Sequence, residues 1–328
     1  MNVDMFALER LKADVAALVR RNDVRYRLAS LRYRVRRRIA PRRQVRKVFL
    51  TFAAGTHFDT RYIVEDVRRL NLFDSLYGLK RKDLGEAFWE RHGAFVRAHP
   101  RGFGFWVWKP FIIQRCLRAM RDDDILVYSD AGAIVMPEDG VRARLEQHFQ
   151  DIQQWPVGLG GAFATGYVSP IHCKADVFAA LGVQGENDRA VPQYEGGRII
   201  CRKHPAAMRI IDLWARLAWA RHYHLFDDSP SHLPNDSGFK EHRHDQAIFS
   251  ILMHRYGARV WHHGVFAKCR AVKSIARAVL AGKPVNKIQH DESLSDAENH
   301  RRAMFRLWAE RFRQAAKSGE DANQPQTS

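Results

Sequence analysis

Gly102-Phe-Gly-Phe-Trp-Val-Trp-Lys-Pro110 and the later run Asp122-Asp-Asp-Ile-Leu-Val-Tyr-Ser-Asp-Ala-Gly-Ala-Ile-Val135 decide the fold of this chain. Between them, apolar residues recur at helical spacing, which predicts an amphipathic helix over 110–120. Pro110 suits its entry because a proline needs no hydrogen-bond partner for its nitrogen there. Ile125 to Tyr128 form a short apolar run, which is typical of a strand buried on both faces of a parallel sheet. The sequence therefore predicts an α/β fold.

Small and polar residues follow that strand at once: Ser129, Asp130, Ala131 and Gly132. Open α/β sheets bind their ligands at the carboxyl ends of strands. Small residues let a ligand approach the backbone, and a carboxylate can bind a metal ion or a sugar hydroxyl. We expect all four residues to contact a ligand, although an aspartate here can equally be a turn or cap residue.

Tyr128-Ser-Asp130-Ala-Gly132-Ala-Ile-Val135 resembles the tyrosine-x-aspartate-alanine-aspartate strand end of GT-A-fold glycosyltransferases. The W-V-W-K-P segment and His244-Asp245-Gln246 are also similar to bacterial members, and the resemblance covers residues 47–265. It implies a mixed, mainly parallel GT-A-like sheet flanked by helices. In that family an aspartate pair binds a divalent cation, Mn or Mg, that bridges the two phosphates of the donor. Asp130 matches the first aspartate, whereas Gly132 stands in place of the second.

Charge is concentrated at the N-terminus. The whole chain of 328 residues has a formal net charge of +18, whereas residues 1–47 hold 15 Lys or Arg against 4 acidic residues and so contribute +11. With 46% hydrophobic residues the chain can bury a large core. We predict a basic helical extension over 1–46, a GT-A-like catalytic domain over 47–270, a C-terminal helical segment over 271–317 and a disordered tail over 318–328.

The extension allows three interpretations. Residues 25–47 carry eleven basic and no acidic residues among apolar ones. They can anchor the chain peripherally to an anionic membrane surface, where each basic residue contributes about 1 kcal/mol. They can instead form a solvated helix packed on the main domain. Nucleic-acid binding is the third use, but no recognition motif accompanies it.

The four cysteines are far apart, so they indicate neither a zinc site nor a disulfide framework. No apolar run is long enough to span a bilayer, and the N-terminus lacks the apolar core of a signal peptide. A cytoplasmic location fits these features, and the basic anchor would hold the protein peripherally on the inner face of the plasma membrane.

Candidate donor-binding residues come from three segments. Residues 48–55 read as the first buried strand, so Phe52, Ala53 and Gly55 are expected to contact the base and ribose at its end. The resemblance assigns Asp83 to the base, although Asp83 can equally cap a helix before Leu84. The aromatic residues of 103–108, including Trp108, can flank a base or sugar while Lys109 neutralises a phosphate. Alternatively, these aromatic residues fill the core.

Catalytic candidates lie in Glu241-His-Arg-His244-Asp245-Gln246, which is predicted to open a helix after a turn-rich loop and possible lid over 226–240. The positive end of a helix favours an anion nearby. The resemblance implies that Asp245 and Gln246 face the sugar and the acceptor. If transfer inverts the anomeric centre, Asp245 is the first choice of general base and Glu241 the second. If transfer retains configuration, the same groups position the donor. The alternative is an ordinary helix cap with a solvated charged turn.

Arg259-Val-Trp-His-His263 follows as a last strand with two histidines. Imidazole binds manganese-like ions, and a late histidine often completes the metal site in the resembled family. His263 with Asp130 is therefore the expected pair of metal ligands, or His262 in its place. Lys268 and Arg270 can instead supply positive charge to the leaving diphosphate.

The resemblance implies glycosyl transfer from a nucleotide sugar to a hydroxyl acceptor. Together with the basic anchor, it implies a glycan or lipid-linked acceptor in the synthesis of cell-surface polysaccharide or lipopolysaccharide. Two alternatives stay open. One is a non-catalytic nucleotide-sugar or membrane-surface binding protein with a degenerate site, as Gly132 suggests. The other is a basic nucleic-acid-associated protein, whose binding would depend on salt.

Overall fold

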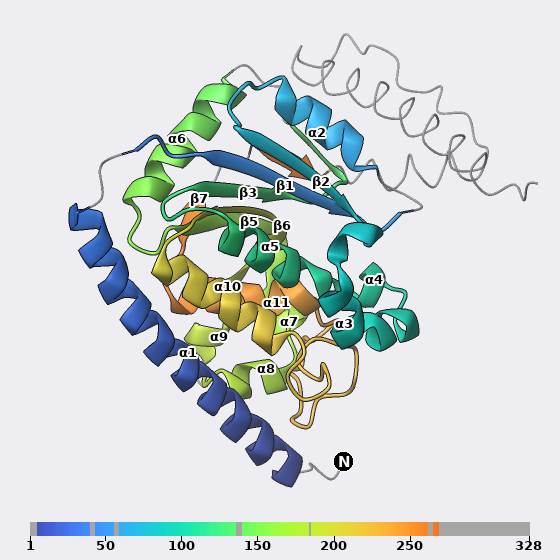
Figure 1. The fold of residues 1–328 in the computed structure, drawn as a ribbon. Coiled ribbons are helices and arrows are strands. Elements are labelled where there is room, and N and C mark those ends of the chain that lie inside the picture. The colour runs from blue at the N-terminus through green and yellow to red at the C-terminus, as the bar shows by residue number, and fades with distance from the viewer. Residues whose placement is uncertain are drawn as a thin grey trace, which may run out of the picture. The chain divides into compact units, whose positions relative to one another are not determined.

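The computed structural model describes residues 5–39, 43–55, 59–135, 140–183, 185–261 and 265–268. The chain divides into two compact units, each built from separate stretches of sequence. The first comprises 1–47, 84–128 and 149–263, and the second comprises 48–83, 129–148 and 264–328. The described residues form an α/β structure with parallel and antiparallel strand pairs, flanked by helices (Figure 1). The predicted α/β class is confirmed.

Four strands of one mixed sheet lie wholly or mainly in the first unit. They are β3 (Ile125–Ser129), β5 (Leu159–Val168), β6 (Pro192–Arg202) and β7 (Arg259–Trp261), in the order β3-β6-β5-β7. β5 runs antiparallel to β6 and parallel to β7. The four side chains from Ile125 to Tyr128 are at most 1% exposed, which confirms the predicted strand and its burial.

Helices of the first unit pack on one another and on this sheet. α10 (Pro205–Leu217) contacts α5 (Trp108–Ala119) and α11 (His244–Arg255), and α11 lies against β6. The unit also contains α3 (Glu86–Ala98), α4 (Gly102–Phe105), α7 (Ser169–His172), α8 (Ala175–Ala180) and α9 (Glu186–Arg189). The 3-10 helix η1 (Arg81–Leu84) begins in the second unit and ends in this one.

Two helix starts differ from the prediction. α5 begins at Trp108, two residues before Pro110, and a proline is still accommodated because the first four N–H groups of a helix have no intrahelical partner. α11 begins at His244 rather than Glu241. The chain before it is held in another conformation, since the backbone N–H groups of Lys240 and Arg243 donate to the carbonyls of Ile171 and His172.

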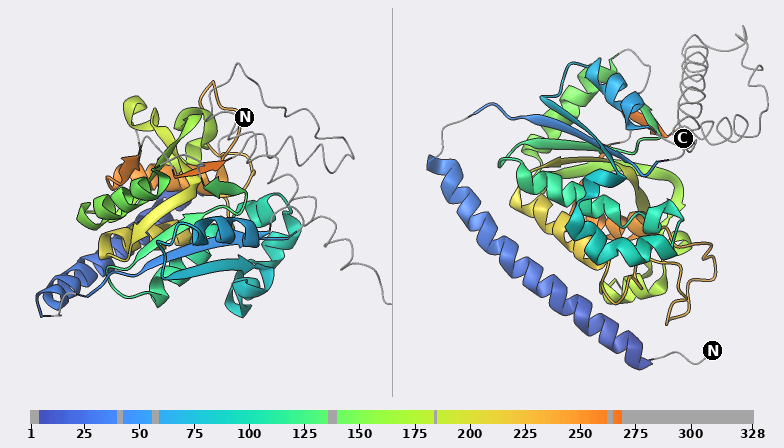
Figure 2. Two further views of the ribbon diagram at one scale, coloured as in Figure 1. Left: turned by 90° about the horizontal axis from the view of Figure 1, so that it is seen from above. Right: turned by 45° about the vertical axis from the view of Figure 1, so that its right-hand side comes forward.

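α1 (Met5–Ile39) is one continuous helix that contacts α10 and α8, and Figures 1 and 2 both show it running along α10. Its buried face is a stripe at helical spacing, formed by Leu8, Leu11, Val15, Val19, Asn22 and Tyr26. Polar contacts extend the packing: the Tyr26 hydroxyl donates to Asp212, and the Tyr33 hydroxyl donates to Asp123. The N-terminal region is thus a helix packed on the first unit.

The second unit contains two small strand pairs. β1 (Lys47–Ala53) pairs in parallel with β2 (Ser75–Lys80), and β4 (Ala133–Val135) pairs antiparallel with β8 (Phe266–Lys268). α2 (Thr60–Arg68) contacts β2 and β4. α6 (Val141–Gln154) begins in this unit and ends in the first. The strand at 259–261 was predicted to be the last one. It is not, because β8 follows β7 along the chain. None of the described helices is both long and apolar enough to cross a membrane.

Candidate active site

The aromatic turn that precedes α5 has an unusual backbone. Phe103, Phe105 and Trp106 have φ angles of 56°, 50° and 63°, in the left-handed region that bulky residues rarely adopt. Each such residue costs roughly 1–2 kcal/mol, and strain of this kind concentrates at functional sites. Gly104 permits the turn, since its φ is 78° and a Cβ there would lie 2.7 Å from a methyl group of Val96. The turn ends before Trp108, so Trp108 and Lys109 lie in the first turn of α5 and not in the predicted loop.

Lys109 forms a buried ion pair with Asp245 of α11. Lys109 Nζ lies 2.8 Å from Asp245 Oδ2, and the two side chains are 3% and 6% exposed. The ammonium group also lies 5.7 Å from the ring centre of Trp108 and 5.8 Å from that of Tyr128. The structure therefore brings together a charged residue from each of the two segments that the sequence singled out.

Asp245 is fixed on several sides. Its backbone carbonyl accepts a hydrogen bond of 3.1 Å from the indole of Trp214. A Cβ on Gly196 of β6 would lie 3.1 Å from Asp245 Oδ2, so this position of β6 leaves little room beside the carboxylate. The next residue, Gln246, donates to the side chain of buried Gln193 at 2.9 Å. Within the described residues, Asp245 Oδ2 accepts no aligned hydrogen bond, so it keeps acceptor capacity beyond its ion pair.

His244 begins α11 with a φ of 45° and is 2% exposed. Its ring stacks on Phe105 at 4.5 Å and lies 5.5 Å from the ring of Trp106. Burial lowers the pKa of His244 despite the opposing effects of the Phe226 carbonyl and of Asp228, so the ring is neutral at pH 7. Nδ1 lies 2.9 Å from the Phe226 carbonyl and must donate to it, which leaves Nε2 as an acceptor. Asp228 Oδ1 lies 3.6 Å from Nε2.

Glu241 sits in a more exposed network, with 39% of its side chain accessible. It accepts a 3.0 Å hydrogen bond from Arg243, and Arg101 lies 3.5 Å away while also pairing with Asp228 at 3.0 Å. Burial alone would raise the pKa of Glu241, but the two arginines outweigh it and the pKa is lowered. A carboxylate stabilised in this way is a weaker base than one without arginine partners.

The predicted base-binding residues lie in the second unit. Phe52 and Ala53 are 3% and 8% exposed in β1, while Gly55 has a φ of 101° and open space around it. Asp83 accepts a hydrogen bond of 2.8 Å from the backbone N–H of Lys80. Asp83 therefore stabilises the turn after β2, which differs from the helix cap that was its alternative role.

The strand end after β3 forms a tight turn into β4. The carbonyl of Asp130 accepts a 2.9 Å hydrogen bond from Ala133, and Ala133 lies opposite Lys268 in the β4–β8 pair. Ser129 and Ala131 are buried, whereas Asp130 and Gly132 are partly accessible. Lys268 is thus close in the backbone to the predicted donor-binding turn.

Asp130 and His263 were predicted to be ligands of one metal ion, and the described residues do not test this prediction. His262 and His263 lie outside the described residues, as does Arg270. Among the described residues, no group of three candidate ligands includes Asp130. Gly132 contributes no side chain, so the described part of this turn offers one carboxylate, and the metal site of Asp130 and His263 stays a prediction.

Two site residues carried no signal in the sequence. Gln193 and Arg101 contact Gln246 and Glu241, but each is a single polar residue in a segment with no motif of its own. A lone glutamine near a strand start predicts nothing, and an arginine among many is not distinctive. Only the three-dimensional contacts identify them.

Comparison with known proteins adds little. No protein-family model matches the chain, and no curated protein matches its sequence. One solved structure that is similar is the apo form of mouse xyloside xylosyltransferase 1, with 12% sequence identity and a TM-score of 0.37. The match covers 66% of this chain and 72% of that chain. Likeness at this TM-score carries no conclusion about the fold type or the reaction.

Proposed function

We propose that this chain is a glycosyltransferase of the GT-A type, which moves a sugar from a nucleotide diphosphate donor to a hydroxyl acceptor. The observation that carries the proposal is the buried ion pair between Lys109 and Asp245. The resemblance to the family rests in part on the W-V-W-K-P and H-D-Q segments, and their charged residues meet in one desolvated place. Charges are seldom buried unless they are paired or needed for function.

The reaction needs a base, a leaving-group stabiliser and a means of orienting the sugar. The acceptor oxygen attacks the anomeric carbon, the bond from that carbon to the diphosphate oxygen breaks, and the diphosphate leaves with the electron pair. In an inverting reaction the acceptor proton passes to a base. Asp245 is the favoured base because it lies in the buried site with Lys109, and Glu241, in the more exposed arginine network, is the second choice. If configuration is retained, these groups orient the donor instead.

Other residues have supporting roles in the proposal. Neutral His244 offers Nε2 as an acceptor for a sugar or acceptor hydroxyl, and Gln246 is oriented by Gln193. Lys109 balances the charge of Asp245. No step of this mechanism is assigned to a metal ion.

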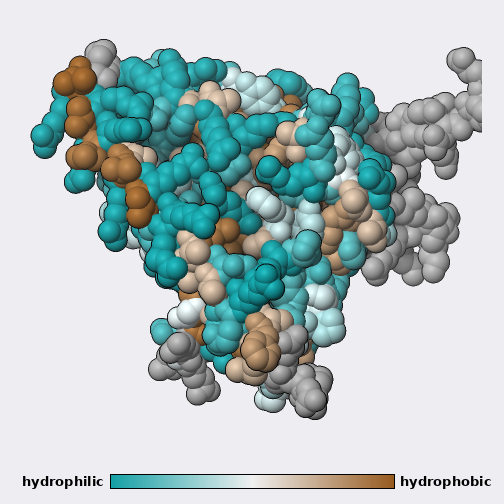
Figure 3. Space-filling view, turned by 60° about the horizontal axis from the view of Figure 1, so that its bottom comes forward, coloured by the Kyte–Doolittle hydropathy of each residue, from teal (hydrophilic) through white to brown (hydrophobic). Residues whose placement is uncertain are grey.

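A lipid-linked or membrane-proximal acceptor is supported by the outer face of α1. Val24, Leu28, Leu31 and Val35 form a second stripe at helical spacing, each 53–58% exposed. Figure 3 shows a line of hydrophobic side chains bordered by hydrophilic ones along this helix. Arg27, Arg32, Arg34 and Arg38 are exposed and have no acidic partner within the described residues. A basic helix with an exposed apolar stripe is the type that lies in the surface of an anionic membrane.

The first test is binding of donors, measured as the thermal shift of the folded protein with UDP-, GDP- and CMP-sugars, with and without manganese. One donor class is expected to raise the melting temperature, since a ligand at 100 times its Kd stabilises by about 2.7 kcal/mol. Release of the nucleotide with water as acceptor then reports on catalysis. Asp245→Asn is expected to keep the donor shift but lose at least about 100-fold in turnover.

Asp188→Asn is the matched control, because Asp188 is an exposed aspartate of the same unit. It is expected to behave like the wild type in both assays. If no donor shifts the folded protein, the transferase proposal fails, and binding of lipid or nucleic acid by the same protein then favours the binding-protein alternative. If Asp130→Ala alone abolishes a manganese-dependent shift, the donor metal is assigned to that turn.

A further inference from the structure

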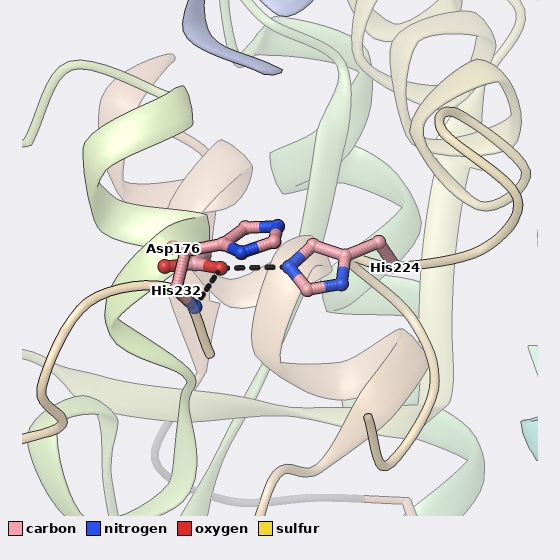
Figure 4. Close-up of side chains that lie close together, drawn as sticks. All are labelled: Asp176, His224 and His232. Carbon is pink, nitrogen blue, oxygen red and sulfur yellow. Dashed lines mark hydrogen bonds and ion pairs between the residues drawn. The ribbon is translucent and has the colours of Figure 1, made fainter. Parts of the chain in front are cut away.

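We propose that Asp176, His224 and His232 form a site for a transition-metal ion of the zinc type. Each residue offers one ligand atom, and the three atoms lie within 4.8 Å of one another. Figure 4 shows the two imidazoles meeting the carboxylate from different segments. Asp176 belongs to α8, His224 follows α10, and His232 belongs to the loop 226–240. All three are in the first unit, and none belongs to the proposed donor site.

Asp176 is held ready as an anionic ligand. Its side chain is fully buried, Oδ1 accepts a 2.9 Å hydrogen bond from the N–H of Leu233, and Oδ2 accepts one of 2.8 Å from the N–H of His232. These two backbone hydrogen bonds fix the orientation of the carboxylate toward the two histidines.

In His224, the ring nitrogen that would not bind the metal has a hydrogen-bond partner, as is usual for metal-binding histidines. Nε2 lies 2.7 Å from Asp176 Oδ2, and Nδ1 lies 3.0 Å from the hydroxyl of Ser229. That hydroxyl donates to Asp227 at 2.5 Å, so its oxygen can accept Nδ1–H of His224 when Nε2, which donates to Asp176 in the absence of a metal ion, binds the ion instead. An imidazole whose Nδ1–H is bound in this way can present Nε2 to a metal ion, with its ring orientation fixed.

His232 provides a separate observation that points to a bound metal ion. Within the described residues its ring nitrogens make no hydrogen bond or ion pair, although the ring is partly buried and stacks on His224 at 4.5 Å. One of those nitrogens is among the three clustered ligand atoms. Two imidazoles and one carboxylate are ligands that zinc prefers, whereas magnesium and calcium prefer oxygen alone. Water would complete a tetrahedral set.

The ion would tie the loop 226–240 to the body of the unit. Three consecutive residues before His224, namely Arg221, His222 and Tyr223, have φ angles of 50°, 54° and 71°, which shows that the chain is turned sharply to present this histidine. The same loop begins with Phe226 and Asp228, which contact His244. A metal ion bound by His224, just before the loop, and His232, within it, would restrain the chain between them. This restraint would stabilise the residues that contact His244.

The test is zinc binding by the full chain after treatment with a chelator. Calorimetric titration with zinc chloride is expected to show one equivalent bound and an increased melting temperature, and cobalt is expected to give the visible absorption of a tetrahedral site. His232→Ala is expected to weaken zinc binding by more than about 100-fold. Ser229→Ala, which leaves all three ligands in place but removes the contact to Nδ1 of His224, is expected to weaken it by about 10- to 100-fold.

His222→Asn and Asp130→Ala are the controls, and both are expected to bind zinc as the wild type does. His222 is an exposed histidine two residues from His224, and asparagine tolerates its left-handed backbone. Circular dichroism of each variant checks the fold, and His232→Gln replaces His232→Ala if the latter unfolds. Failure of the wild type to bind one equivalent, or equal binding by the folded His232 variant, overturns the site. Loss of zinc in Asp130→Ala alone also overturns it and assigns the ion to the donor turn.

Discussion

The contact between Lys109 and Asp245 places two opposite charges in a buried position, where each side chain depends on the other. A buried ion pair gains Coulomb energy only against a large desolvation cost, so it is not strongly stabilising as a whole. Removing one partner is strongly destabilising, because the remaining charged side chain, 3% or 6% exposed, is then buried without a counter-charge. The pair is therefore sensitive to single changes even if its net contribution to the free energy of folding is small.

We expect Lys109→Met and Asp245→Asn each to lower the free energy of unfolding, Lys109→Met by about 3–5 kcal/mol because it strands a buried carboxylate. The double variant is expected to lose less than the sum of the two, since neither charge is then left alone. Urea unfolding of the wild type, both single variants and the double variant measures this coupling. The exposed pair Lys12–Glu9, 2.9 Å apart against 2.8 Å for the buried pair, is the control and is expected to contribute less than about 1 kcal/mol. Equal small losses in both pairs would show that the buried pair is solvated in solution.

Sequence reasoning selected Lys109, His244, Asp245 and Gln246 one by one but not their contacts. Their chemistry and their place in short motifs drew attention to them. The distance between Lys109 and Asp245 depends on how α5 and α11 pack around α10, which no local pattern encodes. The left-handed aromatic residues were also unpredictable, since phenylalanine and tryptophan have no preference for that conformation.

At the scale of elements, α1 presents two apolar stripes with different expected effects. Leu11 is 1% exposed against the first unit, whereas Leu31 is 55% exposed. We expect Leu11→Ala to lower the free energy of unfolding by about 2–5 kcal/mol, because it removes buried methyl groups and leaves a cavity. Leu31→Asp is expected to change it by less than about 0.5 kcal/mol. Urea unfolding compares the two variants.

The same two variants test the membrane-facing part of the proposed function. Leu31→Asp is expected to reduce co-sedimentation with vesicles that contain anionic lipid, because it adds a negative charge to the exposed stripe. Folded Leu11→Ala is expected to bind as the wild type does, and neutral vesicles are the control for charge. Unchanged vesicle binding by Leu31→Asp would show that this stripe does not contact lipid.

Periodic elements were predictable and their ends were less so. The helix at 110–120 and the buried strand at 125–128 follow from spacing alone, and the structure confirms both. The start of α11 was wrong by three residues, because hydrogen bonds from Lys240 and Arg243 to α7 residues hold the preceding chain. Boundaries fixed by tertiary hydrogen bonds leave no trace in the local pattern.

At the scale of the whole molecule, the α/β class followed from the sequence, but the division into two units did not. Each unit is assembled from segments separated by long stretches of the other, so no linker or change of composition marks a boundary. The proposed domain boundaries therefore remain a prediction, and residues 271–328 lie outside the described residues. The cluster of Asp176, His224 and His232 was missed for a related reason, because its ligands come from an α8 residue and two irregular segments without a metal-binding spacing.

Buried histidines predict how the stability of the molecule responds to acid. Burial, aided by Arg91, lowers the pKa of His92 to about 4, and burial, aided by Arg202, lowers the pKa of His204 to about 4. In the unfolded chain a histidine titrates near pH 6.5. Between these values the unfolded state binds protons that the folded state does not, so the free energy of unfolding falls as the pH falls. The full contribution is present above about pH 6.5.

Each histidine is expected to remove on the order of 2–3 kcal/mol between about pH 6.5 and pH 4, at about 1.4 kcal/mol per pH unit. His92→Gln removes one of these titrating groups while keeping a polar side chain that can bond the Tyr223 hydroxyl, which His92 Nδ1 meets at 2.9 Å. The difference in free energy of unfolding between about pH 7.5 and pH 5, measured in urea, should therefore be smaller in His92→Gln than in the wild type by on the order of 1–2 kcal/mol. His222→Asn, at an exposed histidine, should leave the difference unchanged. If both variants lose as much stability as the wild type, His92 is already accessible to protons in the folded state, and the acid sensitivity in this pH range must come from other buried histidines such as His204.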